Sequence, residues 1–129
     1  KDIVLNFFKE WKKIKGDYDS ENEEVAIKRL FSGLESLNTI RIMYVEIDKA
    51  IIGLSVFELL QNGYAMGDFQ KGNIKFRGIY EFLNYSIGKY LKEMGFKNYN
   101  IEQDLGIEGL RRAKLDYNPT FLRKYTIKV

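Results

Sequence analysis

The sequence predicts one α/β domain, α+β in its layout, whose mixed and mostly antiparallel sheet is flanked by helices. Apolar residues recur at helical spacing up to Asn38, the period then changes to that of strands, and helical spacing returns from Ile79 to Met94. Turn signals divide the middle stretch into three runs, as expected of an antiparallel meander. The 129 residues are enough for one domain with its own core and too few for two ordinary ones.

Two amphipathic helices open the chain. The first is predicted from Asp2 to Lys15, ends at Gly16, and places on one face the apolar residues Ile3, Val4, Phe7, Phe8, Trp11 and Ile14. The second begins at Ser20-Glu-Asn-Glu23, a capping box in which the Ser hydroxyl and the Glu carboxylate satisfy free amides reciprocally. Asn38 is expected to close it.

Three strands are predicted next. Thr39 to Asp48 is apolar on both faces, which indicates a strand covered on both sides. Asp48-Lys49 is a plausible turn into a second strand, Ala50 to Leu60. Asn62-Gly63 is a stronger hairpin signal, because both residues tolerate positive φ, and the third strand follows at Tyr64 to Phe69.

The C-terminal half begins with a long amphipathic helix that ends at Gly95. Its predicted buried stripe consists of Ile79, Phe82, Leu83, Ile87, Leu91 and Met94. A strand from Lys97 to Gln103 follows, then a tight turn at Gly106 and a short helix that stops before Pro119. A last strand is predicted at about Phe121 to Val129.

Composition excludes several kinds of site. The chain has no Cys and no His, so it has no disulfide, thiolate nucleophile, Ser-His-Asp triad or imidazole metal site, and acid–base work falls to Asp, Glu, Lys, Tyr or water. The net charge of +3 favours anionic partners mildly and is not that of a dedicated nucleic-acid binder. No apolar run has the length of a membrane span and no signal peptide is recognisable, which favours a cytoplasmic setting.

A basic stretch leads into the long helix. Lys71, Lys75 and Arg77 precede a helix N-terminus, whose free amides and dipole favour anions, and Gly78 lets backbone approach backbone. Phosphate or pyrophosphate is the natural ligand. The alternative is an ordinary solvated basic loop.

A polar stretch ends the predicted fourth strand. Strand alternation places Asn100, Glu102 and Asp104 on one face, with the two carboxylates about 6–7 Å apart. Neighbouring carboxylates repel, so one of them can have a raised pKa, and a carboxylate with such a pKa can act as a general base near neutral pH. Arg111 and Lys114 on the next helix can neutralise these carboxylates or hold an anion. The alternatives are that Asp104 caps that helix and that Glu102 forms a structural ion pair.

Tyrosines are the other possible acids, and Tyr80 and Tyr117 flank the two stretches. Most tyrosines are packing residues with a solvated hydroxyl. Their position alone singles these two out.

Four motifs carry a family resemblance. They are Phe8-x-x-Trp11, Phe69-Gln-Lys71, Arg77-Gly-Ile-Tyr80, and Asn100-x-Glu-Gln-Asp-Leu-Gly-Ile-x-Gly-Leu-Arg-x-Ala-Lys114 followed by Tyr117 and Pro119. Together they resemble the phosphatidylglycerol lysyltransferase C-terminal domain family over essentially the whole chain. The resemblance implies a fold like the Gcn5-related N-acetyltransferases (GNAT), often as two halves in tandem. This chain resembles the second half, and it begins without Met, so we expect it to be a piece of a longer protein.

The resemblance also implies a donor. Acetyltransferases of this fold grip the pyrophosphate of coenzyme A with Arg/Gln-x-x-Gly-x-Gly/Ala, and the matching run here is Lys75-Phe-Arg-Gly78-Ile-Tyr80, with Tyr80 where the pattern has a small residue. Relatives that transfer amino acids use aminoacyl-tRNA. We therefore expect that no cofactor is tightly bound and that acyl-CoA or aminoacyl-tRNA is the co-substrate. The expected partners are a small-molecule or phosphorylated donor, the tRNA acceptor end, or a preceding GNAT-like half.

The sequence thus predicts transfer of an acyl or aminoacyl group to an amine or hydroxyl. The expected roles are donor phosphate binding by Lys71, Lys75, Arg77, Gly78 and Tyr80, proton transfer by Glu102, Asp104 and Tyr117, and substrate binding by Asn100, Arg111 and Lys114. The alternative is a non-catalytic binding or regulatory domain for a phosphorylated ligand.

Overall fold

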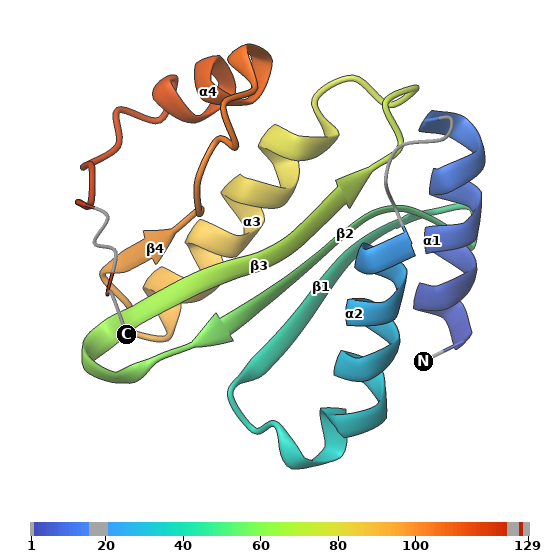
Figure 1. Ribbon diagram of the computed structural model, residues 1–129, viewed down its shortest axis with the longest axis horizontal. Coiled ribbons are helices and arrows are strands. Elements are labelled where there is room, and N and C mark those ends of the chain that lie inside the picture. The colour runs from blue at the N-terminus through green and yellow to red at the C-terminus, as the bar shows by residue number, and fades with distance from the viewer. Residues whose placement is uncertain (1, 16–20, 124–126, 128–129) are drawn as a thin grey trace.

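The computed structural model describes residues 2–15, 21–123 and 127. Its elements, in chain order, are α1 (Asp2–Lys15), α2 (Glu21–Gly33), η1 (Leu34–Ser36), β1 (Ile40–Ile47), β2 (Ala50–Leu59), η2 (Gln61–Gly63), β3 (Tyr64–Gly72), α3 (Ile79–Glu93), β4 (Asn98–Asn100) and α4 (Glu108–Leu115). The strands form one sheet in the order β1-β2-β3-β4, in which only the β3–β4 pair is parallel (Figure 1). The predicted class, a mixed and mostly antiparallel sheet flanked by helices, is confirmed.

Helices cover both faces of the sheet (Figure 1). One face carries α1 and α2, whose core residues are Val4, Phe7, Phe8, Trp11, Ile27 and Phe31, with Leu54 of β2. The other face carries α3, which packs through two clusters that contain Ile79, Leu83, Ile87 and Leu91. Two residues of its predicted stripe, Phe82 and Met94, are exposed instead, at 54% and 50%.

The second helix differs from its prediction at the C-terminal end. It ends at Gly33, and a short 3₁₀ turn, η1, continues the chain to Ser36. The predicted capping box at Ser20 lies outside the described residues.

Both hairpin turns are where the sequence placed them. Asp48 and Lys49 have φ of 49° and 65°, and Asn62 and Gly63 have φ of 60° and 71°. Two successive positive φ values match the right-handed twist of the flanking strands, which is why short hairpins use them. The three-stranded meander is therefore confirmed.

The burial predicted for the first strand was wrong. β1 is the edge of the sheet and none of its residues is fully buried, with Tyr44 54% exposed. β2 is the strand enclosed on both faces, and Ile52 to Phe57 are all buried. Apolar side chains on both faces of β1 could not show which strand is central, because strand order follows from tertiary pairing.

The strand predicted after the long helix is present but shorter than expected, and most of the predicted last strand lies outside the described residues. β4 ends at Asn100 rather than Gln103, because the Asn100 side chain accepts a hydrogen bond from the amide of Glu102 at 2.9 Å and Glu102 has φ of 61°. Residues 121–123 do not form a strand, and 124–126, 128 and 129 lie outside the described residues. The short helix is present as α4.

Candidate active site

A β-bulge on β3 marks the candidate site. Val56 pairs with Phe69 and Phe57 pairs with Gly67, so Asp68 is the extra residue between them. β4 pairs only with residues 64 to 66 of β3, so the parallel pairing ends just before the bulge. Bulges re-aim a side chain, and they recur beside active sites. Asp68 thus lies at the point where β3 and the chain that follows β4 are no longer paired and separate.

The electrostatic setting of Asp68 is unfavourable for its ionised form. Loss of hydration has the largest effect, and repulsion from the charges of Glu58 and Glu102 adds to it. Together they raise the pKa of Asp68 to about 6. Its carboxylate accepts no side-chain hydrogen bond from the residues that the structure describes. The group is nonetheless exposed to solvent. It can therefore exchange a proton near neutral pH.

Tyr99 lies against the bulge from β4. A Cβ on Gly67 would lie 2.6 Å from the Tyr99 hydroxyl, so the ring reaches the strand because residue 67 has no side chain. Burial raises the pKa of Tyr99 to about 12, and the charge of Asp68 adds to this effect. The phenol stays neutral at physiological pH.

Ser55 lies behind Tyr99 in the central strand. Its Oγ is fully buried and has no hydrogen bond of normal geometry among the described residues. It lies close enough to the Tyr99 hydroxyl to lower that group's pKa, although burial outweighs the effect. The Tyr99 hydroxyl therefore lies between the Ser55 hydroxyl, which is close to it, and the charge of Asp68, which acts on it.

A chain of side-chain amides leads from β3 to Tyr117. Gln70 Nε2 donates to Asn84 Oδ1 at 2.9 Å, and Asn84 Nδ2 donates to the Tyr117 hydroxyl at 3.0 Å. Because the hydroxyl oxygen of Tyr117 accepts this bond, its own proton is available for donation.

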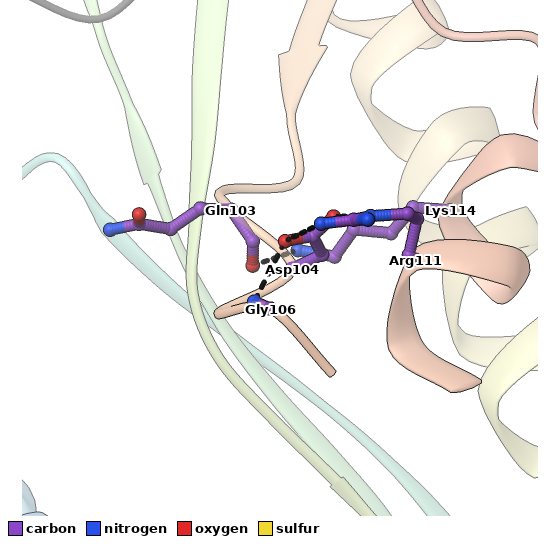
Figure 2. A network of polar contacts seen from close by, with 5 residues as sticks. All are labelled: Gln103, Asp104, Gly106, Arg111 and Lys114. Atoms are coloured by element: carbon purple, nitrogen blue, oxygen red, sulfur yellow. Dashed lines mark hydrogen bonds and ion pairs between the residues drawn. The ribbon is translucent and has the colours of Figure 1, made fainter. Parts of the chain in front are cut away.

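Asp104 and Arg111 form the centre of the polar segment after β4 (Figure 2). Arg111 Nε donates to Asp104 Oδ2 at 2.5 Å, and Gly106 N donates to Asp104 Oδ1 at 2.9 Å. The carboxylate therefore closes the turn before α4, and it raises the pKa of Arg111.

Lys114 fixes the same segment through its backbone. Its ammonium donates to the carbonyl of Ile101, and to that of Gln103 at 2.7 Å. Burial lowers the pKa of Lys114, and the charges of Glu102 and Asp104 partly offset that effect. The lysine thus holds residues 101–103 against α4.

These contacts correct the geometry predicted for this stretch. Glu102 and Asp104 do not share a strand face, because the strand has already ended and Glu102 has positive φ. Glu102 has no ion pair with any described residue, whereas Asp104 is held by Arg111. The N-cap of α4 is Ile107, so Asp104 caps the preceding turn rather than the helix. The catalytic roles predicted for both carboxylates stay predictions.

The basic stretch is divided between a strand and a loop. Lys75 and Arg77 are exposed on the loop before α3. Lys71 belongs to β3, and its ammonium lies 4.5 Å from the centre of the Trp11 ring and 5.0 Å from that of Phe69. Its carbon chain and charge are thus directed at aromatic rings of the α1 face.

Gly78 begins α3 for a different reason than the sequence suggested. Its φ of 84° is left-handed, and a Cβ there would meet no atom within 4 Å. Glycine is therefore needed for the conformation and not for close approach. Within the described residues, the amides of Tyr80 and Glu81 have no hydrogen-bond acceptor, since the bonds near the helix start are Ile79 N to Phe76 O and Phe82 N to Gly78 O.

Tyr80 turns back onto the sheet. Its ring packs beside Ile79 and Leu83, and its hydroxyl makes a long 3.4 Å hydrogen bond to the carbonyl of Gly72. The side chain therefore contacts β3 rather than standing free in the loop.

Sequence reasoning missed the residues around the bulge, which are Ser55, Asp68, Gln70, Asn84 and Tyr99. One signal was present. A glycine inside a strand pattern, here Gly67, is typical of a bulge or of close backbone approach. The sequence carried no such signal for Gln70 and Asn84, which meet only through the packing of α3 on β3.

The part of the chain that the structure describes contains no group of three or more His, Cys, Asp or Glu side chains placed to hold a metal ion. None of the described helices is both long and apolar enough to cross a membrane.

Solved structures share this fold. A conserved protein of unknown function from Bacteroides thetaiotaomicron matches 94% of this chain with a TM-score of 0.82 and 25% identity, and the chain spans 41% of that protein. A ribosomal-protein-alanine N-acetyltransferase from Brucella melitensis matches 99% of the chain and 92% of its own length, with a TM-score of 0.69 and 11% identity. The PaiA N-acetyltransferase from Thermoplasma acidophilum, solved with coenzyme A, matches 88% and 80%, with a TM-score of 0.61 and 16% identity. The fold is that of the GNAT acetyltransferases.

The sequence comparisons agree with this fold. No curated protein matches the chain. The family described as phosphatidylglycerol lysyltransferase, C-terminal, matches residues 2–128. The motifs that suggested this family are therefore not chance similarities, and the chain belongs to the phosphatidylglycerol lysyltransferase C-terminal family.

Proposed function

We propose that this domain transfers an acyl or aminoacyl group to an amine or hydroxyl, with Asp68 as the general base. The observation that carries the proposal is the position of Asp68 on the bulge where the parallel pairing of β3 ends, with its pKa raised to about 6. A base of this pKa is poised for proton transfer near neutral pH. Two neighbours of the same fold are N-acetyltransferases, and one was solved with coenzyme A, which supports an acyl donor of that kind.

The donor phosphates would lie at the start of α3. The free amides of Tyr80 and Glu81 and the positive end of the helix dipole favour an anion there. Lys75 and Arg77 are exposed on the loop before Gly78 and supply positive charge. The phosphate role of Lys71 stays a prediction, and we centre the donor site on the loop.

The reaction needs one proton acceptor and one proton donor. Asp68 would take a proton from the acceptor, whose nitrogen or oxygen then forms a bond to the acyl carbon. The bond from that carbon to the donor sulfur or ester oxygen breaks, and the departing group takes a proton from Tyr117, whose hydroxyl oxygen is occupied by Asn84. Exchange with solvent restores both residues.

The residues after β4 would shape the acceptor side. Arg111 holds Asp104, and Lys114 holds the carbonyls of Ile101 and Gln103, so the segment keeps one conformation. Glu102 acts on Asp68 electrostatically and its side chain has no ion pair in the described structure. We assign it to acceptor binding, with proton transfer as its alternative role.

Thermal-shift titration with acetyl-coenzyme A tests the donor site. A ligand that binds only the native state raises the free energy of unfolding by RT ln(1 + [L]/Kd), about 2.7 kcal/mol at a hundredfold excess over Kd. We expect a saturable rise in Tm that is lost in Lys75→Ala/Arg77→Ala. The control, Lys89→Ala/Lys92→Ala, removes two charges from the other end of α3 and should leave the shift unchanged.

The same titration with an aminoacyl-tRNA separates the two donors. A shift with charged tRNA alone makes it the donor. A shift with acetyl-coenzyme A and no turnover to any amine or hydroxyl supports the competing function, a binding domain for a phosphorylated ligand. No shift with either donor contradicts the donor site.

A further inference from the structure

A cavity of about 400 Å³ lies between α2 and the sheet. Its lining residues come from one helix and three strands and are Ala26, Ile27, Leu30, Ile40, Glu58, Asp68 and Phe69. Small-molecule sites usually have volumes of about 300–1,000 Å³, so the space suits a small ligand. Asp68, the proposed base, is part of its wall.

The wall combines an apolar surface with two carboxylates. Five of the seven lining residues are apolar, and none of the seven carries a positive charge. Glu58 accepts a hydrogen bond from the Thr39 hydroxyl at 2.8 Å, and neither Glu58 nor Asp68 forms an ion pair with a described residue. Two carboxylates thus repel each other beside an apolar surface, and no cation is paired with them among the described residues.

We propose that this cavity binds a protonated primary amine, whose ammonium lies between Glu58 and Asp68 and whose apolar body contacts Ile27, Leu30 and Phe69. Charge and shape both select this ligand. The ammonium relieves the repulsion between the carboxylates, while the aliphatic or aromatic body fills the apolar part of the cavity. A neutral alcohol of the same shape gains only the second effect, and an organic acid is repelled.

The bound amine would be the acyl acceptor, and to that extent the inference rests on the proposed function. Asp68 lines the cavity and also lies at the point where β3 and β4 stop pairing. There it interacts electrostatically with Tyr99 and Glu102. An amine held at Glu58 therefore has its nitrogen beside the proposed base. The ammonium gives one proton to Asp68, which frees the lone pair that attacks the acyl carbon, and the nitrogen releases a second proton to solvent as the amide bond forms. Binding itself needs no acyl donor, so it is measured separately from transfer.

NMR titration of the ¹⁵N-labelled protein with 2-phenylethylamine and with 2-phenylethanol tests the cavity. We expect the amine to bind saturably, with shifts at residues 26–30 and 68–69, and at least tenfold more tightly than the alcohol. Glu58→Gln keeps the oxygen that accepts from Thr39 and removes the charge, so it should weaken the amine at least tenfold and leave the alcohol unchanged. Glu93→Gln, at the end of α3 on the other sheet face, is the matched control.

Either part can fail alone. Amine binding that depends on Glu58, without acyl transfer from any donor, leaves the cavity assignment intact and overturns the proposed function. Equal affinity for amine and alcohol, an unchanged amine affinity in Glu58→Gln, or shifts confined to other residues overturn the cavity assignment, whatever the activity.

Discussion

Asp68 shows how one residue can couple a site to folding. Its carboxylate has a raised pKa because of lost hydration and the charges of Glu58 and Glu102. The ionised form of such a group lowers the free energy of unfolding. Groups with strongly shifted pKa values of this kind are common at functional sites.

Asp68→Asn should increase the free energy of unfolding at pH 7. The folded pKa of about 6 lies above the ordinary aspartate value of 3.8, so ionisation opposes folding as pH rises between these values, and the penalty is complete above pH 6. Solvent screening at this exposed carboxylate limits the gain to about 1 kcal/mol. Urea unfolding at pH 7 and at pH 3.5 measures it, and the difference should vanish at the lower pH. A variant less stable than wild type at pH 7 would contradict this electrostatic account.

Lys114→Met should loosen residues 101–103. The substitution keeps the apolar stem and removes the donor to the carbonyls of Ile101 and Gln103. Hydrogen bonds to a charged group contribute about 1.5–3 kcal/mol, and water replaces part of that here. We expect faster amide exchange from Glu102 to Gly106. The control is Lys89→Met on the exposed face of α3, and equal exchange in both variants would show that Lys114 does not hold the segment.

Glycines in β2 and β3 bring α3 close to the sheet. A Cβ on Gly53 would lie 2.8 Å from Ile79 Cδ1 and 3.1 Å from Leu83 Cδ1, and one on Gly72 would lie 2.7 Å from Ile79 Cγ2. These contacts are too short for any side chain. The helix that presents the proposed donor site therefore depends on missing side chains in the strands beneath it.

Gly53→Ala should destabilise the fold by about 1–3 kcal/mol, the usual cost of overpacking. Gly88→Ala is the matched control, since a Cβ there meets no atom within 4 Å and alanine favours the helix by about 0.5–1 kcal/mol. Chemical denaturation of the two variants should give changes of opposite sign. A neutral Gly53→Ala would mean that α3 does not approach the sheet this closely.

Glu24 links the two helices of the other face. It pairs with Lys12 of α1 at 2.7 Å and with Lys28 of α2 at 2.8 Å, and these bonds lower the pKa of Glu24 to about 2. The folded pKa lies below the ordinary glutamate value of 4.5, so the pairing stabilises the fold above pH 4.5 and this contribution is lost as pH falls toward 2. Glu24→Gln should therefore lower Tm at pH 7 and have no effect near pH 2. A pH-independent loss would indicate packing rather than charge.

Local signals predicted the elements well. The bounds of α1, the two hairpin turns and the start of α3 all follow from periodicity and turn chemistry, which depend on neighbouring residues. The burial of β1 and the length of β4 were mistaken, because both depend on which strand pairs with which. The sequence of Asn100 to Asp104 alternates like a strand, yet the Asn100 side chain ends it.

The candidate site was predicted only in part, for the same reason. Charge and position along the chain singled out Lys75, Arg77 and Tyr117, whose roles stay predictions, and Gly78 was chosen for close backbone approach although its positive φ is what requires glycine. Asp68 was not singled out, because a bulge is a property of the register between β2 and β3 and appears only when the strands pair. The amide chain through Gln70 and Asn84 joins residues 14 positions apart and depends on how α3 lies on β3.

At the scale of the whole molecule, the two proposed ligand sites lie on opposite faces of the sheet. The start of α3 offers amides and positive charge, and the cavity beneath α2 offers carboxylates and an apolar wall. Asp68 belongs to the wall of the cavity, on the bulge just beyond the β3 residues that pair with β4. In the proposed reaction, an anionic donor and a cationic acceptor would reach Asp68 from opposite faces of the sheet.

Transfer of the acyl group to 2-phenylethylamine, measured for wild type, Asp68→Asn and Glu102→Gln from pH 5 to 8, tests this account most directly. The acyl donor in this assay is whichever of acetyl-coenzyme A and aminoacyl-tRNA raises the Tm in the thermal-shift titration. We predict that kcat/KM of wild type rises through about pH 6, that Asp68→Asn lowers it by about 10²–10⁴-fold and removes this rise, and that Glu102→Gln has a smaller effect and keeps the rise. Full activity in Asp68→Asn, or no transfer by wild type from either donor, would contradict the assignment of this domain as an acyltransferase with Asp68 as its base.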